Sequence, residues 1–183
     1  AIVNSIFAMK CLGYPDDHPV LANQLREMEN LMIYDGDKLY LQPCVSPVWD
    51  TAWAIIALHE SGMPGADSSL QKAGQWLLSK EVRHYGDWAL KCKVDEPSGW
   101  YFQYANEFYP DTDDSAAVLM ALQRVSLPER MHKEKAVLRG LKWLLAMQCD
   151  DGGWGAFDRN NNKAILNHIP FADFNALLDP STS

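Results

Sequence analysis

At 183 residues, the chain is long enough to form a domain with a sizeable hydrophobic core. Hydrophobic residues make up 48% and charged residues 22%, which is typical of globular proteins, and the formal net charge of −8 argues against a nucleic-acid partner. The four cysteines are scattered without a CxxC spacing. We interpret them as reduced thiols of a cytosolic protein and expect no metal site and no cofactor.

The first part of the chain predicts helices and a short extended piece. Residues 1–12 and 19–33 look helical and resemble a degenerate first copy of a repeat, while residues 38–41 predict a short strand. A second extended piece is predicted at 99–104. No apolar run reaches the roughly 18 residues that a membrane-spanning helix needs.

The rest of the chain repeats one pattern of helix, turn, helix and Gly/Trp loop. DTAWAIIAL, which opens at Asp50, returns as DSAAVLMAL, which opens at Asp114, and each Asp with its Ser or Thr looks like a helix N-cap. Breakers follow at 62–65 and 127–128, before two segments rich in Leu and Trp. Repeated helix pairs predict an all-α fold that forms part of an α/α toroid.

A glutamine–tryptophan pattern joins each helix pair to its loop. In its full form, at 139–154, it reads RGLKWLLAMQCDDGGW, where Gln can bond the open helix end and the last indole can stack over it. In the other copy we match Gly86-Asp87-Trp88 with the final GGW, and Lys80 or Glu81 stands in place of Gln, which predicts a weaker clip. The tryptophans of this pattern are interpreted as scaffold, and Trp53 as core.

The run Pro110-Asp111-Thr112-Asp113-Asp114 places three carboxyl groups within four residues. In a dry cavity they would repel one another, so at least one would keep its proton near neutral pH. Acidic residues at a helix start also cap free N–H groups and complement the helix dipole. A calcium loop is excluded because Ala116 and Leu122 occupy the places of its glycine and glutamate. The run alone therefore leaves capping and catalysis open.

Taken together, the glutamine–tryptophan repeats and the Asp-x-Asp-Asp run resemble the triterpene cyclases, and specifically the bacterial squalene–hopene cyclases. The resemblance covers essentially the whole chain and implies two α-barrel domains with a cavity between them. We expect residues 1–183 to be the central fragment of such a two-domain cyclase, with the acid-activating His following Ser183, and the isolated fragment to be inactive. Further matching stretches lie at 42–51, 99–103, 109–114, 152–158 and 167–171.

The resemblance implies a reaction in which a terminal double bond of squalene is protonated and rings then close in sequence. The final cation loses a proton or captures water, giving hopene or hopanol. Asp113 matches the proton donor of the family, and Asp111 and Asp114 match its neighbours. Asp50 matches a supporting acidic residue.

Aromatic residues supply the remaining matches, because aromatic faces stabilise carbocations in an apolar cavity. Trp49 and Phe102 match cavity residues near the first-formed rings, and Gln103 matches a polar neighbour of the acid. Phe157 stands where many family members have Tyr, so the face is kept and the hydroxyl is lost. Phe171 lies in a stretch that resembles the constriction of the substrate entrance.

The partners implied by the resemblance are squalene and, through parts not evident in this sequence, the cytoplasmic surface of a bacterial membrane; a homodimer is compatible with it. Two alternatives stay open. A class II diterpene cyclase shares the acidic run and needs a diphosphate site, for which no Lys/Arg cluster is evident. A non-catalytic α-toroid that binds a lipid or peptide would bury none of the Asp side chains against an aromatic cavity.

Overall fold

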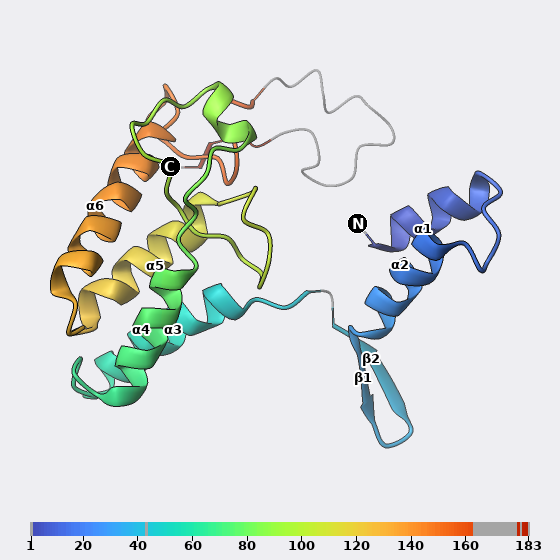
Figure 1. Cartoon of the computed structure of the whole chain (residues 1–183), viewed down its shortest axis with the longest axis horizontal. Helices are drawn as coiled ribbons and strands as arrows, with labels where there is room; N and C mark the ends of the chain where they lie inside the picture. Colours follow the sequence, from blue (N-terminus) through green and yellow to red (C-terminus); the bar gives the residue numbers. More distant parts are fainter. Residues whose placement is uncertain (1, 43, 163–178, 180, 183) are drawn as a thin grey trace. The chain divides into compact units, whose positions relative to one another are not determined.

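The structure is a computed structural model that describes residues 2–42, 44–162, 179 and 181–182 (Figure 1). The chain divides into two compact units, Ala1–Val45 and Ser46–Ser183, each described by itself. Helices make up most of the regular structure, as the sequence predicts.

The first unit contains two helices and a hairpin. Helices α1 (Ile2–Cys11) and α2 (Pro19–Glu29) lie within the two predicted helical segments. Strands β1 (Met32–Asp35) and β2 (Lys38–Leu41) pair antiparallel, and Gly36 in the turn has a φ of +62°. The short strand predicted at 38–41 is confirmed, whereas the helix predicted for 19–33 ends at Glu29 and Met32 and Ile33 belong to β1. An Asp-Gly turn between apolar, aromatic segments favours a hairpin over continuation of the helix.

The second unit consists of two helix pairs joined by loops. Its elements are α3 (Pro47–Glu60), α4 (Ser68–Ser79), the short 3₁₀ helix η1 (Asp87–Leu90), α5 (Thr112–Arg124) and α6 (Arg130–Ala146). Within this unit α3 packs on α4, and α5 contacts α3, α4 and α6 (Figure 1). The repeated helix pairs predicted from the sequence are therefore present, with α5 at the centre of the contacts.

Helices α3 and α5 begin earlier than the sequence predicts. Helix α3 is preceded by Ser46 as N-cap, and α5 by Asp111, whose side chain accepts the backbone N–H of Asp114. Asp50 and Asp114, the predicted N-caps, lie in the first helical turns instead. Proline explains one shift, since Pro47 is well suited to a first helical turn. In α5 the cap is supplied by Asp111, the first of the three acidic residues, whose backbone is still extended.

The two indoles that close the repeats are Trp100 and Trp154. Trp100 Nε1 donates to the Leu77 carbonyl oxygen at 2.7 Å, and Trp154 Nε1 donates to that of Leu144 at 2.7 Å. Each bond satisfies a carbonyl in the last turns of the preceding helix, α4 or α6. The equivalent of Trp154 is therefore Trp100, and the predicted match with Trp88 is wrong.

The reason is an insertion between α4 and Trp100 that contains η1 and carries its own Gly-x-Trp. Trp88 in this insertion is buried and packs edge-on against Trp143, with ring centroids 5.9 Å apart. Trp53 also differs from its prediction: it is 42% exposed and contacts Trp49 edge-on. The local sequence match thus identified the repeat correctly but paired Trp154 with Trp88 instead of Trp100.

In the first copy Glu81 stands where the second copy has Gln148. The sequence predicts a weaker connection between helix and loop there, but Glu81 makes an ion pair with Arg139. Its carboxylate accepts two bonds from Arg139, at 2.9 and 2.7 Å, and one from Ser98 Oγ at 2.8 Å. The Glu81 side chain is only 4% exposed. In the second copy, Gln148 makes one bond, from Nε2 to the Gly152 carbonyl oxygen at 2.7 Å. The carboxylate therefore ties α4 to α6 as well as to its own loop.

Candidate active site

A pocket of about 480 Å³ lies where the N-terminus of α5 meets the loops around it, all within the second unit. Its lining joins acidic groups from one helix start to aromatic rings from three separate stretches of chain. Seven of the residues proposed from the sequence lie around it: Trp49, Phe102, Gln103, Asp111, Asp113, Asp114 and Phe157.

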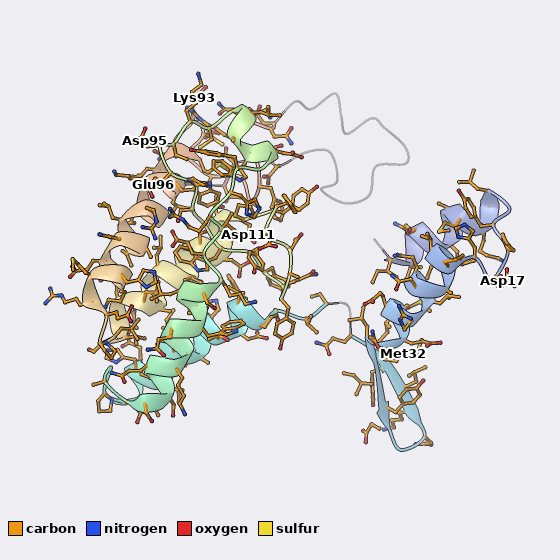
Figure 2. All side chains as sticks on the ribbon, in the orientation of Figure 1. Asp17, Met32, Lys93, Asp95, Glu96 and Asp111 are labelled. Carbon is orange, nitrogen blue, oxygen red and sulfur yellow. The ribbon has the colours of Figure 1, made fainter. Side chains whose placement is uncertain are left out.

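Asp111 is placed by both backbone and side-chain bonds. Its N–H donates to the Trp100 carbonyl oxygen at 2.9 Å, which holds Asp111 (labelled in Figure 2) beside the buried Trp100. Its Oδ1 accepts the Asp114 N–H at 2.7 Å and so caps the helix. Asp111 is 5% exposed and Asp114 2% exposed. Asp111 therefore caps the helix and is also a buried carboxyl group of the pocket lining.

The burial of this pair keeps a proton at the site. Burial is the main cause that raises the pKa of Asp111 to about 9, and the hydrogen bond to Asp114 and that group's charge act in the same direction. Burial also raises the pKa of Asp114, while its hydrogen bond with Asp111 opposes the rise. The favoured arrangement near neutral pH is a protonated Asp111 that donates to an Asp114 carboxylate.

Asp113 differs from its two neighbours because it is exposed on the pocket wall. Repulsion from Asp113 is the smallest of the causes that raise the pKa of Asp111 and of Asp114. Asp114 Oδ1 is buried without a hydrogen-bond partner. The three carboxyl groups therefore form a buried, mutually bonded pair and a third group that faces the pocket.

Three aromatic rings line the same pocket. Trp49 lies in the first turn of α3 and is half-buried, Phe102 follows Trp100 in the loop before α5, and Phe157 lies in the loop after α6 with 49% of its surface exposed. Gln103 is exposed beside them. These faces and the acidic group can surround one apolar substrate, since aromatic rings attract cations and tolerate hydrocarbon.

One further residue predicted for the site, Asp50, lies outside the pocket lining. Asp50 is exposed, is not among the residues that line the pocket, and accepts Ser46 Oγ at 2.9 Å. Phe171 lies outside the described residues. The sequence reasoning also missed two lining residues, Asn106 and Ala156. Ala156 adjoins Phe157 in sequence, while Asn106 is one polar residue of a loop and no pattern distinguishes it.

Among the described residues, no group of three or more His, Cys, Asp or Glu side chains is placed to hold a metal ion. Within that same part of the chain, no helix has the length and apolarity needed to cross a membrane.

Comparison with known proteins identifies the family. A family model described as the squalene-hopene cyclase C-terminal domain matches residues 45–183, which is essentially the second unit. The chain belongs to this family.

Relatives match it almost end to end. The chain is 45% identical to a squalene–hopene cyclase of Zymomonas mobilis, with all of this chain and 29% of that protein covered. It is 39% identical to that of Alicyclobacillus acidocaldarius, over 96% of this chain and 28% of the relative. A dammaradiene synthase of Dryopteris crassirhizoma is 44% identical, over 98% of this chain and 26% of that protein. The chain thus spans less than a third of the length of these relatives.

Proposed function

We propose that the protein to which this chain contributes is a cyclase that protonates squalene and closes it into a polycyclic triterpene. The observation that carries the proposal is the buried Asp111–Asp114 pair, with Asp113 beside it, in a pocket that Trp49, Phe102 and Phe157 line. The names of the relatives support the substrate. A non-catalytic scaffold is disfavoured because it gives no reason to bury two carboxyl groups against aromatic rings.

The acid is assigned to Asp113. Asp111 and Asp114 are already bonded to each other, whereas Asp113 lies on the pocket wall, and it matches the proton donor of the family. An alkene is a very weak base, so Asp113, which is exposed in this chain, must be protonated and shielded from water in the whole enzyme. The π electrons of a terminal double bond take the proton, a C–H bond forms, and a tertiary cation remains. Asp113 is left as a carboxylate beside the pair.

The aromatic residues are assigned to the cationic intermediates. Each ring face contributes roughly 0.5–2 kcal/mol when the contact is dry. Trp49 and Phe102 are assigned to the cations of the first-formed rings on the basis of the family resemblance, and Phe157 contributes a further aromatic face to the same pocket. Gln103 is assigned to the polar surroundings of the acid, and Asp50 to support of the helix start from outside the pocket lining.

The remaining steps define the reaction class. Loss of a proton from the final cation gives hopene, an isomer of squalene, whereas capture of water gives a hopanol by a lyase-type addition. We propose that the whole enzyme has two α/α-barrel domains, that residues 46–183 supply part of one toroid, and that the fragment alone is inactive. The repeated helix pairs support the toroid, and the short coverage of each relative supports the longer enzyme.

Squalene is a hydrocarbon that partitions into bilayers, so we propose that the whole enzyme works at the cytoplasmic surface of a membrane. Phe171 is assigned to the substrate entrance on the basis of the family resemblance. Cosedimentation of the full-length enzyme with lipid vesicles tests the membrane proposal, and sedimentation equilibrium tests the homodimer that the resemblance allows.

The deciding experiment feeds squalene to the full-length enzyme and identifies products by gas chromatography. We expect hopene or hopanol from the native enzyme and none from Asp113→Asn. Asp95→Asn, which removes an exposed carboxyl group that does not line the pocket, is the control and should keep activity. Activity retained in Asp113→Asn but lost in Asp111→Asn would move the donor role to Asp111. Absence of any cyclised product from the folded native enzyme would refute the function.

A further inference from the structure

The loop that carries Phe157 is wrapped around a single carboxylate. Asp179 Oδ1 accepts the Ala156 N–H at 2.7 Å, and Asp179 Oδ2 accepts the N–H groups of Phe157 and of Asp158, the latter at 2.6 Å. Three successive backbone donors therefore converge on one side chain. Asp179 is itself held by its own N–H, which donates to the Asn161 carbonyl oxygen at 2.9 Å.

The same loop is held from its other side by Thr112. The Thr112 N–H donates to the Ala156 carbonyl oxygen at 2.9 Å, and Thr112 Oγ1 donates to that of Gly155 at 2.8 Å. Thr112 is 4% exposed and stands between Asp111 and Asp113. One residue thus joins the acidic start of α5 directly to the loop that carries Phe157.

The loop has little freedom to settle in another position. A Cβ added at Gly155 would lie 2.6 Å from the Asp158 carbonyl oxygen and 2.7 Å from that of Asp179. Approaches this close need glycine, because backbone atoms on both sides cannot move away cheaply. The bonds to Thr112 and Asp179 therefore fix the backbone that carries Phe157 relative to the acidic start of α5.

We infer that Thr112 and Asp179, here called the loop brace, are positioning residues that hold the Phe157 ring in register with the acid. The inference rests on the proposed function. Neither residue of the loop brace lines the pocket, so both act through Phe157. An aromatic face stabilises a cation only within about 6 Å of its centroid. Displacing the ring leaves protonation intact but exposes a mid-course cation, which then loses a proton to give a partly cyclised alkene.

The test compares products of the full-length enzyme with squalene. Thr112→Val removes the hydroxyl at nearly constant shape, and Thr112→Ser restores it. We expect Thr112→Val and Asp179→Asn each to raise the share of partly cyclised products at least fivefold, Phe157→Ala to give the same set of products, and Thr112→Ser to match the native enzyme. A Thr112→Val/Phe157→Ala double variant should add little to Phe157→Ala. A native product pattern in Thr112→Val, or a Thr112→Ser pattern equal to that of Thr112→Val, would overturn the inference.

A second measurement separates this inference from the proposed function. Hydrogen exchange of the amides of residues 156–158, followed in the full-length protein, reports the bonds to Asp179 without any turnover. We expect slow exchange in the native protein and at least tenfold faster exchange in Asp179→Asn, with helix α6 unchanged as an internal control. If squalene is not cyclised at all, the function fails, while faster exchange in Asp179→Asn still upholds the brace. Equal exchange in the two proteins would overturn it.

Discussion

The protonated state of Asp111 predicts how the stability of the 183-residue chain depends on pH. Asp111→Asn is the informative perturbation because the amide imitates the protonated acid. Its oxygen can accept the Asp114 N–H, as Asp111 Oδ1 does at 2.7 Å, and its NH₂ group can donate to the Asp114 carboxylate. The variant keeps these bonds and removes only the ability to ionise.

The direction follows from the two states of Asp111. Its pKa is raised from 3.8 to about 9 on folding, mainly by burial. Below pH 3.8 both states are protonated and the stabilisation is complete; between 3.8 and about 9 only the folded chain holds the proton. The free energy of unfolding therefore falls as pH rises, by at most about 1.4 kcal/mol per pH unit. From pH 5 to pH 8 the native chain should lose up to about 4 kcal/mol through this group.

Urea unfolding followed by tryptophan fluorescence at pH 5 and pH 8 measures both proteins. The native chain should unfold at clearly lower urea at pH 8, and Asp111→Asn should lose most of this difference. Asp95→Asn, with the same replacement of a carboxyl group by an amide at an exposed site, should keep the native difference. An Asp111→Asn chain with the same pH dependence as the native chain would refute the reasoning that burial protonates Asp111.

Two further predictions concern packing and charge in the second unit, and urea unfolding at pH 7 checks both. Gly140→Ala should destabilise by about 1–3 kcal/mol, because the added Cβ would lie 2.8 Å from the buried Trp100 ring; no loss would mean that the ring can move. Arg139→Ala should destabilise by about 1–3 kcal/mol, because the buried Glu81 carboxylate loses the two Arg139 bonds and keeps only Ser98 and Arg83 as partners. Adding Glu81→Gln to Arg139→Ala should recover part of that loss, and failure to recover any would place the cost in lost packing instead.

The sequence predicts the helix pairs because helical periodicity and breakers are local properties. Helices α3 to α6 follow from them, and so does the strand at Lys38–Leu41. The boundaries at Ser46 and Asp111 are less evident, since several acidic or hydroxyl residues near each start could cap. The choice between Trp88 and Trp100 depends on which indole reaches the end of α4, and an insertion hides that from any local alignment.

The candidate site, too, was predictable in the types of its residues but not in their burial. Residue type and resemblance select the acids and rings that line the pocket, but not which carboxyl groups are buried, because burial depends on loops distant in sequence. The exposed position of Asp113 and the buried bond between Asp111 and Asp114 require the fold. Asp179 is still harder to predict: a single Asp before a proline has no distinguishing pattern, and its importance comes from three backbone donors that only the folded loop presents.

The bonds between Thr112 and the loop at 155–158 also bear on the order in which parts of the structure form while the chain is being synthesised. Thr112 and Gly155 are separated by 43 residues, so the start of α5 leaves the ribosome well before its partner exists. Closing so long a loop has an entropic cost that local helix contacts do not carry. We therefore expect α5 and α6 to pack first, and the acidic end of α5 to acquire its final surroundings late, after residues 155–158 have emerged.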